Sequence, residues 1–238
     1  MNQQRKIAIM QPYIFPFIGY FQLINAVDKF IIYDDVNFIK QGWINRNNIL
    51  VNGKSFSFSI PLHDISSFRL INETEVNEKL YLNWVNKFMK TIELNYAKAP
   101  YLQNIFNLIR SVFLSGENKI SRIAGLSINK VCNYLQLPIT IINTSAVYNN
   151  AHLKNFERVL DICKIEEADT YVNASGGQKL YKKEKFKEQS INLFFIKPIS
   201  KKYLQFKNEF VPFLSIIDVL MFNSIEETRE LLKAYELI

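Results

Sequence analysis

The stretch KIAIMQPYIFPFIGYFQLINAVDKFIIYDD, from Lys6 to Asp35, places two short apolar runs on either side of a longer amphipathic one. The runs KIAIM and KFIIY are bounded by polar residues or proline, which is typical of buried strands. Between them, IGYFQLINAV carries apolar residues near helical spacing. A strand–helix–strand unit sets its strands parallel, with a right-handed crossover. The stretch therefore predicts the start of a parallel α/β sheet.

The rest of the chain continues this alternation after a long interruption. Asn52-Gly53 lies between two alternating runs in 48–60, a strong hairpin signal. Apolar residues then recur at helical spacing in 75–97, 99–114 and 120–137. Further strands are expected at 138–145, 169–175 and 191–199. A helix is expected at 155–164, and two short helices follow from Leu214. We expect one α/β domain over 1–238, a parallel-sheet Rossmann-like core in which 37–136 is a hairpin-plus-helical insertion.

Composition points to a folded, soluble chain. Apolar residues make up 48% of the 238 positions, and disordered segments are usually poorer in them. No run of about 18 uninterrupted apolar residues occurs, so no membrane span is expected. Gln11, Pro12 and Pro16 break the apolar N-terminal run, and no cleavage site follows, which disfavours a signal peptide. Cys132 and Cys163 lie in helical stretches and fit buried thiols in a reducing cytoplasm.

The net charge of +7 is concentrated in one segment. From Lys179 to Lys207 there are nine lysines against Glu184 and Glu188. Such a segment attracts phosphates, nucleic acid or anionic lipid, or it is simply a solvated surface. Nucleic acid is the less favoured partner, because only seven of the 29 basic residues are arginine and base readout favours arginine.

The turn after the first strand is the first candidate site, because ligands of parallel α/β sheets bind at the carboxyl ends of strands. Gln11 can donate and accept hydrogen bonds, Tyr13 and Tyr20 are aromatic platforms with polar tips, and a helix start near Gly19 offers free N–H groups to a phosphate. The alternative is a hydrophobic joint shaped by the two prolines. We favour that core role for Phe15, Phe17 and Phe21.

Asp34 and Asp35 end the second strand. Adjacent strand residues point to opposite faces, so the two carboxylates are not expected to form a joint acid–base pair. One of them could bind a ribose hydroxyl, an ammonium group or Mg²⁺; the alternative is a strand-ending turn with an Asx cap.

The segment QGWINRNNI provides the best single candidate for anion binding. Arg46 is a rigid cationic fork suited to a carboxylate or phosphate. Trp43 can stack on a base or sugar ring, and Asn47 adds an amide. The alternative for Arg46 is an ion pair with an aspartate at the surface.

Two later segments carry weaker signals. In NASGGQKLY, Ser175-Gly176-Gly177 could form a backbone nest that binds an anion. The glycines do not have the spacing of a P-loop or of a dinucleotide-binding fingerprint. An ordinary turn between a strand and a helix fits the segment as well. Ser215, three residues before Asp218, forms a variant capping box with Asp in place of Glu or Gln.

Several catalytic signatures are missing from the sequence. His63 and His152 are the only histidines, and neither has zinc-ligand spacing to cysteines or other histidines. No GxSxG elbow occurs. We therefore expect no metal, no evident cofactor and no covalent nucleophile; catalysis would rely on positioning two bound substrates. PFIGYFQLI occupies the place of the two-histidine turn of nucleotidyltransferases, with Phe17 and Tyr20 where the histidines would be, so adenylyl transfer is in doubt.

Five blocks together resemble the WbqC-like family over nearly the full length and in the same order: IAIMQPYIFPFIGYFQLI, YDDVNFIKQGWINRNNI, NYAKAPY, ADTYVNASGGQKLY and FLSIIDVLMFN. The resemblance implies a cytoplasmic role in bacterial O-antigen or other surface-polysaccharide biosynthesis. Carried over position by position, its blocks single out Gln11, Pro12, Tyr13, Gly19, Tyr20, Asp34, Asp35, Trp43, Arg46, Asn47, Ser175, Gly176, Tyr181, Ser215 and Asp218. Ala174 departs from the family pattern, in which glycine is commoner.

The resemblance implies a transferase that forms an amide, acyl or aminoacyl, on a nucleotide-linked amino sugar. Arg46 would clamp a phosphate or carboxylate, and Asp34 or Asp35 would orient or deprotonate the amine. The alternative is a sugar-nucleotide-binding or scaffolding protein of the polysaccharide assembly machinery without chemistry of its own.

Overall fold

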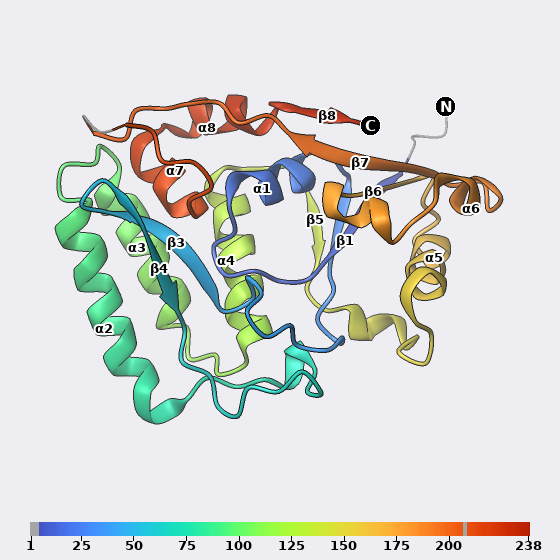
Figure 1. Ribbon diagram of the computed structural model, residues 1–238, viewed down its shortest axis with the longest axis horizontal. Helices are drawn as coiled ribbons and strands as arrows, with labels where there is room; N and C mark the ends of the chain where they lie inside the picture. Colours follow the sequence, from blue (N-terminus) through green and yellow to red (C-terminus); the bar gives the residue numbers. More distant parts are fainter. Residues whose placement is uncertain (1–4, 207–208) are drawn as a thin grey trace.

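A six-stranded sheet forms the centre of the computed structural model, which describes residues 5–206 and 209–238 (Figure 1). The strand order is β5-β2-β1-β6-β7-β8. All neighbours are parallel except β7 and β8. The strands are β1 (Lys6–Met10), β2 (Lys29–Ile32), β5 (Thr140–Ile142), β6 (Thr170–Ala174), β7 (Asn192–Pro198) and β8 (Tyr235–Leu237).

Counted along the chain, these strands follow the order 3-2-1-4-5-6, that of the doubly wound Rossmann sheet. The predicted fold class is confirmed. In such a sheet the chain reverses direction between its first and fourth strands, here β1 and β6, and ligands bind in the crevice outside the carboxyl ends at that point. The carboxyl ends of β1 and β6 are therefore where a ligand is first sought.

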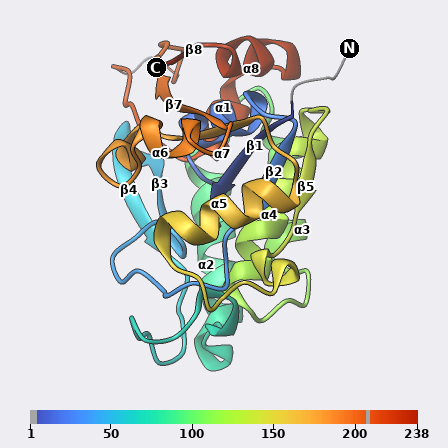
Figure 2. The same cartoon turned by 90° about the vertical axis from the view of Figure 1, so that its right-hand side faces the viewer.

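Helices cover both faces of the sheet (Figures 1 and 2). α1 (Ile18–Asn25) connects β1 to β2. α5 (Asn155–Ile165) and the short α6 (Lys183–Lys187) lie at the right of Figure 1, on the side away from α4 (Ile120–Tyr134). Three 3-10 turns complete the helical elements: η1 (Ile71–Glu73), η2 (Ser145–Tyr148) and η3 (Ser175–Lys179).

The connection from β2 to β5 contains the predicted hairpin and helices. β3 (Arg46–Val51) and β4 (Lys54–Ser59) form a separate antiparallel pair. At its turn Asn52 has φ 49° and Gly53 φ 73°, the left-handed pair that an Asn-Gly hairpin turn requires. The helices that follow are α2 (Glu78–Asn95), α3 (Leu102–Phe113) and α4 (Ile120–Tyr134).

The chain ends with α7 (Ile216–Phe222), α8 (Ile225–Leu232) and β8. The two short helices were predicted, and Ser224 begins α8 with a capping box to Glu227. β8 was not predicted, because its sequence YEL lies in no apolar run of the kind that marks β5 within PITIINTS. None of the helices in the described part of the chain combines the length and apolar character needed to cross a membrane.

Candidate functional site

The turn after β1 is built around one residue in an unusual backbone conformation. Phe15 has φ 39°, in the left-handed region that bulky residues rarely adopt. Its N–H donates to Ser127 Oγ at 3.0 Å, and its carbonyl oxygen accepts from Asn47 Nδ2 and Ser215 Oγ, each at 2.7 Å. Side chains from α4, β3 and the N-cap of α7 thus brace this turn. Strained positions braced in this way are common at binding sites.

The other aromatic side chains of the turn fasten it to the sheet. Tyr20 is buried, and its hydroxyl donates to the Gln11 carbonyl oxygen at 2.8 Å. A Cβ atom on Gly19 would lie 2.4 Å from the Phe17 ring and 3.0 Å from Pro198. Gly19 therefore allows close packing against the side chains of Phe17 and Pro198. The core role expected for the phenylalanines fits Phe15, which is fully buried, but Phe17 is only half-buried.

On the outer side of this turn is a pocket of about 240 Å³, which we call the aromatic pocket. Because a cavity of about 150 Å³ holds a benzene-sized group, the pocket has room for roughly ten non-hydrogen atoms, close to the size of a hexose. Most of its wall is aromatic, and the amide of Asn48 makes no hydrogen bond to any described residue. Rings that cover apolar faces, with a few amides, are typical of small-ligand pockets. The pocket is lined by Tyr13, Pro16, Phe17, Trp43, Asn47, Asn48 and Phe213.

Arg46 lies beside this pocket. Its Nε donates to the Gly42 carbonyl oxygen at 2.8 Å, its Nη2 donates to the Gln41 carbonyl oxygen, and its guanidinium carbon is 5.4 Å from the centre of the Trp43 ring. Among residues 5–206 and 209–238 it forms no ion pair, so the expected surface pair with an aspartate is not found there. Arg46 thus stiffens the loop that presents Trp43, which is 44% exposed.

Asp34 and Asp35 are both buried and both contact Ser145. Thr144 Oγ1 donates to Asp34 Oδ1 at 2.7 Å, and the Ser145 N–H donates to the same oxygen at 3.2 Å. Ser145 Oγ donates to Asp35 Oδ1. The expectation that the two carboxylates point to opposite faces does not hold, because β2 ends at Ile32 and strand alternation ends with it. Burial raises the pKa of Asp34, partly offset by the hydrogen bonds from Thr144 and Ser145.

Asp35 also pairs with Arg158 of α5, whose side chain is buried. Arg158 Nη2 donates to Asp35 Oδ2, Nη1 donates to the Asp35 carbonyl oxygen at 3.2 Å, and Nε donates to Asn150 Oδ1 at 3.0 Å. The guanidinium lies 4.9 Å from the centre of the Tyr33 ring. Asp35 therefore joins the end of β2 to α5.

The amide side chains of Gln11 and Asn173 lie at the carboxyl ends of β1 and β6, the neighbouring strands where the strand order reverses. Gln11 comes directly after β1, and Asn173 is the last residue but one of β6. The Gln11 amide is half-buried, and neither it nor Asn173 Nδ2 makes a hydrogen bond within the described part of the chain. Gly177 is needed here, because a Cβ on it would lie 2.6 Å from Asn173 Nδ2. Both amides are available to a ligand at the place where this sheet type binds one.

Ser175 and Gly176 lie in the exposed turn η3, next to this crevice. A Cβ on Gly176 would meet no atom within 4 Å, so packing does not require a glycine there. Tyr181 is half-buried with its ring edge-on to Tyr171, and burial raises the pKa of the Tyr181 hydroxyl to about 12.

Asp218 lies on the inner side of α7, away from solvent. Tyr96 donates to its Oδ1 at 2.9 Å, and Tyr203 and Gln205 donate to its Oδ2 at 2.6 and 2.7 Å. Burial raises its pKa, opposed by these three hydrogen bonds. The expected capping is done by Ser215 alone, whose Oγ accepts from the Ile217 N–H at 3.2 Å. Asp218 therefore positions Tyr203.

The basic segment is spread over η3, α6 and β7. Lys183 and Lys185 lie over aromatic rings, and Lys197 pairs with Glu236 at 3.4 Å. Lys207 lies outside the described residues.

The structure thus brings Tyr13, Trp43 and Asn47 together in the aromatic pocket, with Arg46 beside it and Gln11 at the neighbouring strand end. It places Asp34 with Asp35, and Ser175 with Gly176 and Tyr181, at other strand ends of the same edge. Sequence reasoning missed Phe213, Asn48, Asn173 and Arg158. Only Asn173 had a usable signal, as a polar residue at the end of an apolar strand. Within the described residues no three His, Cys, Asp or Glu side chains gather as a metal site would require.

Comparison with known proteins gives one family and one relative. The sequence model of the WbqC-like protein family matches residues 11–230. The chain is 30% identical over 232 residues to the uncharacterized protein Rv1507c of Mycobacterium tuberculosis (strain ATCC 25618 / H37Rv). The aligned region covers 96% of this chain and 98% of that protein. No solved structure matches the chain.

Proposed function

The chain belongs to the WbqC-like protein family, and from this membership and the aromatic pocket we propose that it is a transferase of bacterial surface-polysaccharide biosynthesis. Its acceptor is a nucleotide-linked amino sugar, and its product is an amide on the sugar nitrogen. The aromatic pocket is the observation that carries this proposal, because its rings suit the C–H faces of a sugar and its Asn48 amide suits a hydroxyl.

The nucleotide part is proposed to lie along the crevice between β1 and β6. Support comes from the strand order, which places nucleotide ligands there in other doubly wound sheets. The Gln11 amide and Asn173 Nδ2, which form no hydrogen bond within the described part of the chain, would donate to ribose or phosphate oxygens.

The reaction is an acyl transfer from a thioester donor. The amine lone pair attacks the thioester carbonyl carbon, a C–N bond forms and the C–S bond breaks. The thiol leaves as thiolate and takes up the proton that the amine loses. Asp34 is the proposed proton carrier, because it is a carboxylate just after β2, the strand beside β1, and burial raises its pKa. Arg46 is proposed to hold Trp43 against the sugar.

A second candidate is a sugar-nucleotide-binding protein without chemistry of its own. The observation in its favour is that Asp34 and Asp35 are already engaged by Thr144, Ser145 and Arg158. The two candidates share the binding site and differ in turnover.

The experiment incubates the protein with uridine- and thymidine-diphosphate amino sugars and short acyl-coenzyme A donors, and detects the amide by mass spectrometry. We expect one acceptor to be acylated and Trp43→Ala to lower kcat/KM at least tenfold. Phe68→Ala is the control, since Phe68 is 92% exposed and lies outside the pocket. Binding of a sugar nucleotide without turnover of any donor would favour the second candidate; equal activity of the two variants would contradict the pocket assignment.

A further inference from the structure

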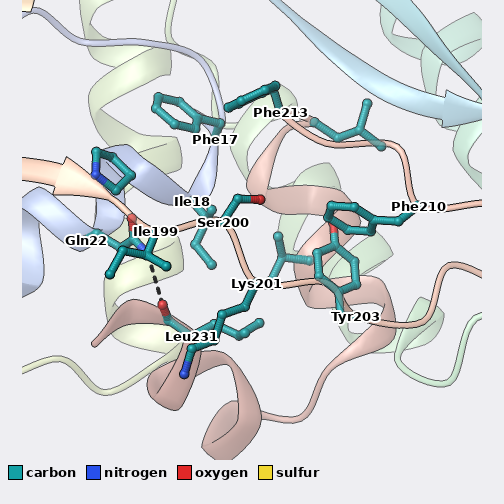
Figure 3. A pocket seen from close by; sticks show the side chains of 13 residues that line it. Phe17, Ile18, Gln22, Ile199, Ser200, Lys201, Tyr203, Phe210, Phe213 and Leu231 are labelled. Carbon is teal, nitrogen blue, oxygen red and sulfur yellow. Dashed lines mark hydrogen bonds between the residues drawn. The ribbon is translucent and has the colours of Figure 1, made fainter. Parts of the chain in front are cut away.

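A second cavity adjoins the aromatic pocket on the side of α7 and α8 (Figure 3). It lies between the first half of α1, the end of β7 and the two C-terminal helices, and its volume is about 120 Å³. Its apolar wall includes Ile18, Pro198, Leu214, Val219 and Leu231. We call it the aliphatic cavity.

The walls of this cavity are held in place by hydrogen bonds. Gln22 Nε2 donates to the Leu231 carbonyl oxygen at 3.0 Å, drawn in Figure 3, and to the Ala234 carbonyl oxygen at 2.9 Å, so α1 is tied to α8. On the opposite wall, the Tyr203 hydroxyl donates to the buried Asp218 at 2.6 Å. The cavity is therefore preformed, and Asp218 supports one wall of it.

Apart from the Tyr203 hydroxyl and the buried Gln22 amide, whose Oε1 accepts no hydrogen bond from any described residue, the polar side chains of this cavity lie at the rim. Ser200 and Lys201 are exposed there, and Lys201 forms no ion pair with any described residue. An apolar interior with one cation at the mouth suits an aliphatic chain attached to an anionic carrier.

The aliphatic cavity shares part of its wall with the aromatic pocket. Phe17 and Phe213 line both cavities. In Figure 3 these two rings lie at the edge of the aliphatic cavity next to each other. Groups bound in the two cavities would both contact these rings and would therefore lie near each other, as a donor and an acceptor must.

We propose that the aliphatic cavity binds the acyl chain of an acyl-coenzyme A donor, with Lys201 at the rim facing its phosphates. This inference rests on the proposed function for the identity of the acceptor. A cavity of about 150 Å³ holds a benzene-sized group, so one of 120 Å³ takes a short chain, roughly two to six carbons. Each buried methylene strengthens binding about fourfold, up to the length that fills the cavity.

The test measures binding of coenzyme A and its acetyl, butyryl, hexanoyl and dodecanoyl thioesters by isothermal titration, without any sugar. Affinity is expected to rise about fourfold per methylene up to hexanoyl and to stop rising before dodecanoyl. Ser200→Trp, a change at an exposed rim position, is expected to abolish the dependence on chain length while leaving the thermal unfolding midpoint unchanged. Ile18→Trp, which fills the cavity from α1, is expected to do the same.

Lys201→Ala and Lys202→Ala form a matched pair, because Lys202 is exposed but does not line the cavity. We expect at least a fivefold weaker affinity for coenzyme A in the first and little change in the second. Equal losses in both variants would overturn the role of Lys201. Chain-length-independent binding, or full chain-length dependence in Ser200→Trp, would overturn the cavity assignment even if amide formation occurs. Chain-length-dependent binding without any amide product would keep the cavity and refute the transferase.

Discussion

Ser215 Oγ donates a 2.7 Å hydrogen bond to the carbonyl oxygen of Phe15, a residue 200 positions earlier in the chain. The same hydroxyl accepts from the Ile217 N–H at the start of α7. One side chain therefore begins a helix and holds the left-handed turn that presents Tyr13 to the aromatic pocket.

Ser215→Ala is expected to lower the free energy of unfolding by about 1–3 kcal/mol, because it removes a helix cap and leaves a buried carbonyl with one partner fewer. Urea denaturation measures this loss. Ser224→Ala is the control: Ser224 caps α8 at an exposed position, and its loss costs about 1 kcal/mol. Only Ser215→Ala should also weaken sugar-nucleotide binding; equal binding by both variants would show that the turn does not position the site.

The ion pair of Asp35 and Arg158 is expected to act as a structural brace. Their side chains are 8% and 4% exposed, and removing either one leaves the other charge buried and unpaired. Asp35→Ala and Arg158→Ala should each cost about 3–5 kcal/mol, and the double variant clearly less than their sum. The exposed pair of Arg5 and Glu167 is the comparison, where Glu167→Ala should cost at most about 1 kcal/mol. Additive losses at Asp35 and Arg158 would contradict the brace.

Asp218 is expected to make stability depend on pH. Burial raises its pKa, so the folded protein binds this proton more tightly than the unfolded chain. This contribution to stability is full below the unfolded pKa of about 4 and is lost as the pH rises through the folded pKa. The stability of wild type relative to Asp218→Asn should therefore fall from pH 4.5 to 7.5 in urea titrations. The exposed Glu93→Gln serves as control, and a rising difference would contradict the assignment.

Cys132 and Cys163 are expected to resist alkylation in the native protein. Both are buried, and burial raises the pKa of each thiol to about 12, so little thiolate forms at pH 8. Iodoacetamide labelling followed by mass spectrometry should modify neither thiol until urea unfolds the chain. Rapid native labelling of either one would show that its helix opens.

The local pattern of apolar and turn residues in the sequence predicted most of the architecture. The two apolar runs flanking the first helix, and Asn52-Gly53 in the hairpin, carry periods that the structure reproduces. β8 was not predicted, because its three residues form a strand by pairing with β7 and carry no strand pattern of their own. The site was harder to predict, since Tyr13, Trp43 and Phe213 meet through tertiary packing. The role of Arg158 could not be predicted from the sequence, because an arginine in an amphipathic helix is ordinarily expected to face solvent. Its burial follows from the contact with Asp35, which the fold creates.

The central claim is that the aromatic pocket holds the sugar of a nucleotide-linked amino sugar. The most direct test is a crystal structure of the protein soaked with a uridine-diphosphate amino sugar. We predict density for the sugar between Tyr13 and Trp43, and density for the nucleotide along Gln11 and Asn173. Density elsewhere on the protein, with the aromatic pocket and the β1–β6 crevice filled only by water, would contradict the claim.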